Sequence, residues 1–321
     1  MRLRDAGITV TTLLALSAQG AWAQSLSGVA APPLGLATQS TDSTGSVASQ
    51  DSILQPRSDP YVALSALEAK QRAVQAAETN LNISLSAMHT QYHENASPGT
   101  GDDENGYSGG GGVGASVLLP QPGLFRDAAL YSAMSLNLSA GNLRYGGHYL
   151  ASGLPVDATD RAVFLRIEGR LGMGFALSQG MELIPFLAGG YQSWNRNIDR
   201  RGQISTDEQY TTGLLGAGVK LDVPVTQRLV LSGTAEMLAL FAGHIVANGV
   251  GFNHGLGGSA EERAALGADY AIQGPLHGFL SLNWEHFNYA GSKPTLSSGG
   301  FYEPLSTTTQ FGVNVGAAYS F

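Results

Sequence analysis

The sequence contains no cysteine, few charged residues and no long apolar run. Without cysteine the protein has no disulfide, no thiolate metal ligand and no cysteine nucleophile. Asp, Glu, Lys and Arg make up 13% of the 321 residues, about half the share usual in globular proteins. The formal net charge of −8 argues against nucleic acid as a partner, because nucleic-acid binders carry basic surfaces.

Apolar residues and glycine, in contrast, are plentiful. Hydrophobic residues make up 43% of the chain, which excludes disorder of the whole, because disordered chains combine low hydrophobicity with high net charge. Glycine accounts for 43 of 321 residues, about twice its average share. This composition suggests that much of the folded surface meets a solvent other than water.

The first 23 residues have the pattern of an export signal. Two arginines precede a short apolar run at 8–16, and an A-x-A cleavage site follows at Ala21 and Ala23. The run is too short to cross a membrane as a helix. We therefore expect residues 1–23 to be a cleaved signal peptide. No later window reaches about 18 consecutive apolar residues, so no transmembrane helix is expected after it.

Three segments precede residue 128. Residues 24–58, rich in Ser, Ala and Pro, are predicted to be a flexible linker. Residues 59–94 are predicted to form one amphipathic helix, because apolar residues recur every seven positions, as in a coiled-coil seam. That helix either packs within the protein or mediates self-association. Residues 95–127, rich in Gly and Asp, are predicted to be a joint. The helix seam consists of Leu67, Val74, Leu81 and Met88.

From residue 128 onward the polarity alternates with a period of two, which predicts β-strands. Strands of about ten residues that alternate in polarity are typical of membrane barrels. The expected fold is therefore all-β, an eight-stranded antiparallel transmembrane up-and-down barrel over residues 128–321. The eight strands are predicted near 129–143, 162–177, 181–195, 208–223, 228–244, 263–273, 276–290 and 307–321.

The connections between these strands alternate in length. Three are tight, at 178–180, 224–227 and 273–275, whereas four longer ones cover 144–161, 196–207, 245–262 and 291–306. Short turns at one end and long loops at the other are how bacterial outer-membrane barrels are built.

One face of each predicted strand is apolar, and the other is small or charged. The small face suits the interior of a narrow barrel, where side chains must be small or must pair. We therefore expect the apolar face to meet lipid and the charged side chains to form an ion-pair network in the lumen. The lumen candidates are Arg166, Glu168, Arg170, Lys220, Glu236, Asp269 and Glu285.

The C-terminal strand carries a more specific pattern. Tyr319 and Phe321 are aromatic residues at alternate positions, and apolar residues alternate before them. This ending resembles the sorting signal of bacterial outer-membrane proteins, and residues 129–321 resemble the small OmpA/OmpX/OmpW-like barrels, a porin-family fold. The resemblance implies location in the outer membrane with both ends of the chain periplasmic. It also implies recognition by the barrel assembly machinery and contact with outer-membrane lipid and lipopolysaccharide.

The function expected from this resemblance is structural, or a surface interaction through the long extracellular loops. The loop 196–207 carries Arg196, Arg200 and Arg201, a cationic cluster suited to lipopolysaccharide phosphates or simply to loop solubility. The alternative is a narrow porin-like channel for small solutes, which a crowded lumen disfavours.

Two further patterns could indicate an enzyme or a metal site, but each is too weak to predict one. Residues 286–291 faintly resemble the histidine motif of outer-membrane lipid A deacylases, but Asn288 stands where those enzymes have a serine nucleophile. A lipid A-modifying enzyme is therefore the less favoured reading. His89 and His93 would share one face of the predicted helix, but two imidazoles alone make a poor metal site. We expect no catalytic residues, no metal and no cofactor.

Overall fold

The computed structural model describes residues 60–95, 101–120, 128–148, 153–199, 206–248, 251–293 and 302–321, with helix side chains described from Ser65 onward. The predicted signal peptide, with Ala21 and Ala23, and the predicted linker at 24–58 lie outside these residues, as do Arg200 and Arg201. The first element is the helix α1, Pro60–Glu78. The strands are β1 (Asn80–Glu94), β2 (Asp103–Pro120), β3 (Ala128–His148), β4 (Pro155–Ala176), β5 (Glu182–Asp199), β6 (Thr206–Pro224), β7 (Leu229–Ala247), β8 (Phe252–Gly255), β9 (Ser259–Gln273), β10 (Leu276–Tyr289) and β11 (Ser306–Ser320), and a short 3-10 turn η2 (Ser178–Gly180) joins β4 to β5.

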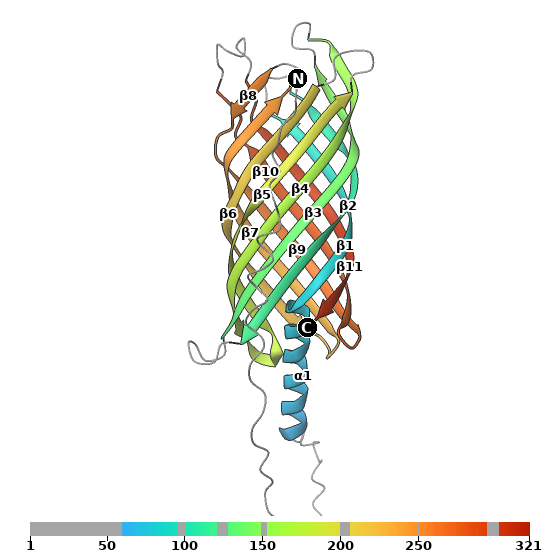
Figure 1. Ribbon diagram of the computed structural model, residues 1–321, viewed down its shortest axis with the longest axis vertical. Coiled ribbons are helices and arrows are strands. Elements are labelled where there is room, and N and C mark those ends of the chain that lie inside the picture. Colours follow the sequence, from blue (N-terminus) through green and yellow to red (C-terminus); the bar gives the residue numbers. More distant parts are fainter. Residues whose placement is uncertain are drawn as a thin grey trace, which may run out of the picture. The chain divides into compact units, whose positions relative to one another are not determined.

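Ten of the described strands form a closed antiparallel barrel (Figure 1). Neighbours in sequence pair with each other from β1 to β7, then β7 pairs with β9, β9 with β10 and β10 with β11. The ring closes where β11 pairs with β1, from Asn80 opposite Ser320 to Glu94 opposite Ser306. The short strand β8 pairs only with the last residues of β7 and lies outside the ring.

The expectation of eight strands is wrong, although each of the eight predicted segments is a strand of this barrel. Residues 80–94, predicted as the second half of a helix, form β1, and most of the predicted joint forms β2. The helix therefore ends at Glu78, and the barrel begins at Asn80 instead of residue 128. The seam position Leu81 lies in β1, where its side chain is 56% exposed on the outer wall.

Side chains alternate across the barrel wall as the sequence predicts. On β11, Val315 and Tyr319 point outward and are 55% and 56% exposed, whereas Gln310 and Ala318 point inward and are each 4% exposed. Because successive side chains of a strand lie on opposite faces, a shift of one residue would move the apolar side chains of a strand to the inside. The apolar face is therefore the outer one.

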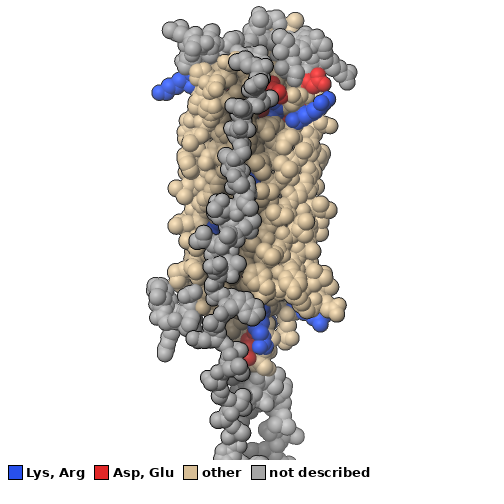
Figure 2. All heavy atoms as spheres, viewed as in Figure 1, with Lys and Arg blue, Asp and Glu red and all other residues tan. Residues whose placement is uncertain are grey.

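The outward face changes character along each strand. On β1 it runs through Leu81, Ile83 and Leu85 and then through His89 and Gln91. The same change from apolar to polar occurs at Asn142 on β3 and at Asn195 on β5. On the face seen in Figure 2, charged side chains gather towards the two ends and the wall between them is nearly free of them. We call the apolar zone the apolar band and the part beyond it the loop-end extension.

The other end of the barrel carries the tight turns and the helix α1 (Figure 1), and we call it the turn end. Gly274, between β9 and β10, has φ of +56°, a backbone conformation that glycine adopts without steric cost. Within the described part of the chain, no helix is long and apolar enough to cross a membrane.

Candidate functional site: the layered lumen

Arginines and glutamates meet across the middle of the barrel. Arg166 on β4 donates to Glu285 on β10 at 3.0 Å and also contacts Glu261 on β9. Arg170 donates to Glu168 at 2.8 Å and to Glu236 on β7 at 2.9 Å. Arg263 on β9 donates to Glu236 at 3.1 Å and lies 3.4 Å from Glu285. We call this set the central layer: Arg166, Glu168, Arg170, Glu236, Glu261, Arg263 and Glu285.

Five of the seven predicted lumen residues lie in the central layer, and two do not. Lys220 contacts Glu78 at the end of α1 and lies 3.7 Å from Asp222. Asp269 lies 2.6 Å from Nδ1 of His277. Both remain inside the barrel, but nearer the turn end.

Sequence reasoning missed two members of the central layer, Glu261 and Arg263. The expected strand begins at 263, which places Glu261 in the predicted loop 245–262. Both residues share the inward phase of Gly267 and Asp269 on β9. Extending the period-two pattern towards the N-terminus by one repeat would have found Glu261.

The central layer is a largely buried network of charged side chains. Arg263 is 18% exposed at its side chain, and its carboxylate partners Glu168 and Glu236 are 4% and 1% exposed. Buried ion pairs require good geometry because removing charges from water is costly, and losing one partner strands the other. The layer therefore has few alternative arrangements.

A second cluster lies beyond the apolar band, and Arg196 is at its centre. The guanidinium donates to Glu104 on β2 at 3.1 Å, to Glu208 on β6 at 2.7 Å and to the hydroxyl of Tyr210 at 3.1 Å. It also lies 4.6 Å from the ring centroid of Tyr92. Arg196 is only 2% exposed, so its predicted place in a solvent-exposed cationic loop is wrong. Arg196 is buried because β5 continues to Asp199 and position 196 faces the barrel interior.

Glu303 closes this cluster from the segment before β11. Tyr210 donates to its Oε1 at 2.6 Å, and the Glu303 backbone NH donates to Ser292 Oγ at 2.8 Å. Burial raises the pKa of Glu303 to about 7, and the nearby carboxylate of Glu208 acts in the same direction. The carboxyl of Glu303 therefore binds a proton more tightly in the folded protein than in an unfolded chain.

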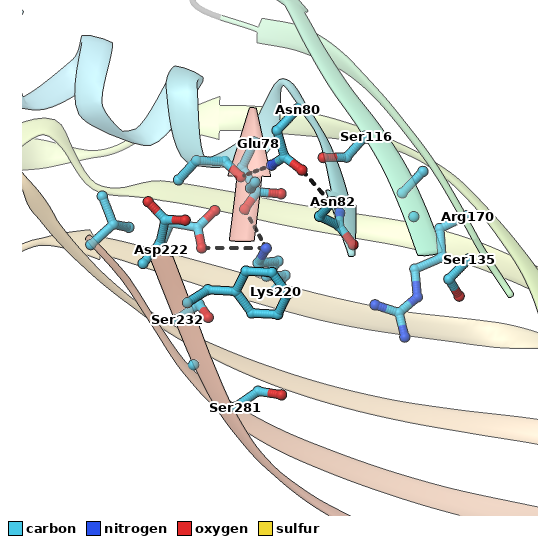
Figure 3. A pocket seen from close by; sticks show the side chains of 18 of the residues that line it. Glu78, Asn80, Asn82, Ser116, Ser135, Arg170, Lys220, Asp222, Ser232 and Ser281 are labelled. Atoms are coloured by element: carbon cyan, nitrogen blue, oxygen red, sulfur yellow. Dashed lines mark hydrogen bonds and ion pairs between the residues drawn. The ribbon is translucent and has the colours of Figure 1, made fainter. Parts of the chain in front are cut away.

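A polar chamber lies between the central layer and the last turn of α1 (Figure 3). It has a volume of about 300 Å³. Glu78 and Lys220 stand at its turn-end wall, and Arg170 stands at the opposite wall. We call this space the turn-end chamber. A smaller space of about 140 Å³ lies on the other side of the central layer, beside Trp194 and Tyr289.

The two histidines considered for a metal lie on a strand, not a helix. His93 Nδ1 is 2.6 Å from Asp103 and His89 Nε2 is 3.1 Å from Asn105, all on the outer wall of β1 and β2. Among the described residues, no three His, Asp or Glu side chains are arranged to hold a metal ion.

This fold defines a class. A closed antiparallel barrel with an even number of strands, an outward apolar band and a polar interior is a transmembrane β-barrel of the outer-membrane type. Such a wall leaves no free sheet edge in lipid, where unpaired backbone groups are costly. Tyr319 and Phe321 lie at its turn end, 56% and 70% exposed.

Comparison with known proteins identifies no particular family. No protein-family model matches the chain, and no curated protein matches it. Among solved structures, the outer membrane protease OmpT of Escherichia coli is 11% identical, with a TM-score of 0.48, over 76% of this chain and 97% of that one. The transport unit of the autotransporter AIDA-I of Escherichia coli is 9% identical, with a TM-score of 0.43, over 80% and 99%. At such scores and identities these neighbours say nothing about the activity of this chain.

Proposed function

We propose that this protein is an outer-membrane barrel with a closed lumen that acts through surface interactions of its loop-end extension. In this proposal the turn end faces the periplasm and the long loops face outward, which is the orientation usual for outer-membrane barrels. Lipopolysaccharide is the proposed lipid neighbour, and the barrel assembly machinery is the proposed assembly partner.

The central layer is the observation that supports a closed lumen. Its three arginines and four glutamates span β4, β7, β9 and β10, and they contact one another across the barrel axis. An open pore of the porin kind needs a wide, water-filled barrel with more strands. A ten-stranded ring filled with paired charge fits a structural or adhesive barrel better.

Planar-bilayer recording of the full-length protein tests this proposal. We expect no steady conductance from the native protein. Replacing Arg263 and Arg166 together by serine removes two of the three arginines of the central layer, and we expect this variant to conduct. A large, steady conductance from the native protein would contradict the closed-lumen proposal and favour the alternative of a narrow channel.

We propose that this protein has no catalytic activity. Nδ1 of His286 lies 2.9 Å from the hydroxyl of Thr309 on β11, and its ring stacks on Trp284 at 6.1 Å between centroids. Asn288 follows it on the same face of β10, and an amide is no nucleophile. Mass spectrometry of lipid A from cells expressing the protein tests this view, and the loss of an acyl chain would contradict it.

A further inference from the structure

Buried charges of opposite sign are not balanced in the cluster around Arg196. The nitrogen atoms of its guanidinium already donate to Glu104, Glu208 and Tyr210. Three carboxyl groups of the cluster are each at most 8% exposed, those of Glu94, Glu104 and Asp160. One positive charge therefore faces several carboxyl groups that are largely closed to water.

Asp160 is the carboxyl group with which this guanidinium forms no ion pair. It lies on β4, opposite Leu143 of β3, and is 0% exposed. The polar groups that face it are the carboxyl of Glu104, the guanidinium of Arg196 and the backbone NH of Asn197. Within the described part of the chain, no group makes a well-aligned hydrogen bond to either of its carboxyl oxygens.

Glu104 offers Asp160 the complementary half of a hydrogen bond. Oε1 of Glu104 accepts from Arg196, whereas its Oε2 is closed to solvent and has no hydrogen-bond partner among the described residues. A protonated carboxyl donates one hydrogen bond, and an ionised carboxyl only accepts. A single proton therefore gives both groups a partner, whereas ionising two neighbouring buried carboxyls is costly.

We propose that Asp160 holds a proton at neutral pH and donates a hydrogen bond to Oε2 of Glu104, and that loss of this proton loosens the loop-end extension in alkali. The bond joins β4 to β2. Once the proton dissociates, two negative charges face each other there, and Arg196 alone opposes their repulsion. This proton switch is separate from the surface role proposed above. The other titratable groups of the cluster are Tyr92 and Glu94 on β1, Asp102, Tyr145 on β3, Glu208 and Tyr210 on β6, and Glu303.

The pKa of Asp160 is shifted in the direction that this switch requires. Burial raises the pKa to about 8, the carboxyl of Glu104 acts in the same direction, and Arg196 acts against both. In an unfolded chain the pKa of an aspartate is about 3.9. The folded state therefore holds this proton between about pH 4 and pH 8 while the unfolded state does not. The contribution of Asp160 to the folding equilibrium constant decreases over that range by up to about tenfold per pH unit.

Urea unfolding in lipid vesicles at pH 5 and pH 9 tests the switch. Asp160→Asn cannot ionise, and its amide can still donate to Glu104. Relative to the native protein, we expect the folding equilibrium constant of this variant to rise at least about tenfold from pH 5 to pH 9. Parallel pH profiles of the native protein and Asp160→Asn overturn the proposal.

Asp157→Asn is the matched control. Asp157 lies on the same strand, but its side chain is 75% exposed and pairs with Arg144, so this variant should keep the native pH profile. Asp160→Val keeps the proposal testable if Asp160→Asn does not fold, which heat-modifiable gel migration reveals. Valine has a similar shape and no ionisable group, and we expect it to remove the same part of the pH dependence. A native pH profile in Asp160→Val overturns the proposal.

Infrared spectroscopy gives a readout that does not depend on unfolding, because a protonated carboxyl absorbs apart from a carboxylate. We expect the native protein to show a protonated-carboxyl band at pH 7 that weakens by pH 9. The band should be smaller in Asp160→Val at pH 7. Absence of the band from the native protein at pH 7, or equal bands in the two proteins, overturns the proposal.

Discussion

The Nε atom of Arg196 on β5 lies 3.1 Å from Oε1 of Glu104 on β2 and joins two walls of the barrel beyond the apolar band. Their side chains are 1% and 0% exposed. The same guanidinium reaches Glu208 at 2.7 Å and the face of Tyr92 at 4.6 Å. The loop-end extension is therefore built around a buried cation, although its outer surface is polar.

Replacing Arg196 by methionine leaves Glu104 buried without its partner. Breaking a buried pair by removing one member costs about 3–5 kcal/mol, so we expect the free energy of unfolding to fall by that order. Urea unfolding in lipid vesicles, followed by tryptophan fluorescence, measures the change. Arg144→Gln is the control, because Arg144 pairs with Asp157 while both side chains are at least 75% exposed, and such pairs contribute about 0–1 kcal/mol. Equal losses in the two variants would refute the role given to Arg196.

The edge of the apolar band can be located with one strand. Leu85 and Gln91 both point outward from β1, Leu85 being 70% exposed. Arginine in the middle of a lipid-facing wall costs about 2–4 kcal/mol, and near or beyond the interface it costs about 0–1 kcal/mol. We expect Leu85→Arg to destabilise the folded barrel in vesicles by the larger amount and Gln91→Arg to be nearly neutral. Similar costs at both positions would mean that the band is placed wrongly.

Stability of the barrel mouth should depend on pH through Glu303. Its pKa is about 7 when folded and about 4.3 in an unfolded chain. The unfolded state therefore loses its proton first as the pH rises, and the contribution of Glu303 to stability decreases from pH 4 to pH 7. The protection factors of the amides of Tyr302, Glu303 and Leu305, which correct for the intrinsic rise of the exchange rate with pH, should be larger at pH 5 than at pH 8. Glu303→Gln should flatten this difference, and an unchanged profile in that variant would exclude Glu303 as its source.

Close approach of two strands requires glycine at position 216. A methyl group there would collide with the carbonyl oxygen of Met237 and lie 2.7 Å from Cα of Leu238 on β7. Overpacking of this kind costs about 1–3 kcal/mol, so Gly216→Ala should lower the urea midpoint. Gly146→Ala is the matched control on β3, because a methyl group at that position meets nothing within 4 Å. If the two variants unfold at the same urea concentration, the steric argument fails.

Part of the fold could be predicted because its causes are local. The eight predicted segments are strands of the barrel because their side chains alternate in polarity along the sequence, as they do on β11. The strand β1 is missed because four apolar residues, two in α1 and two in β1 itself, are spaced by seven. Yet Leu81, Ile83 and Leu85 alternate within the same stretch, and that alternation was the better guide.

The strand β2 could not be recognised in the same way. Residues 109–112 are all glycine, so they carry no polarity to alternate. The tertiary structure explains these glycines, because a methyl group on Gly110 would collide with the carbonyl oxygen of Leu138 on β3. A run that resembles a flexible joint in sequence is therefore a strand packed tightly against its neighbour.

The sequence by itself determined that the chain forms a barrel with an apolar outer wall and charge inside, because side-chain period and turn spacing are properties of neighbouring residues. Only the tertiary structure decided the number of strands and the partners of each charge. Arg166 and Glu285 are 119 positions apart, and Arg196 and Glu104 are 92 apart. Such pairs depend on how the ring closes and on strand register, which no local pattern contains.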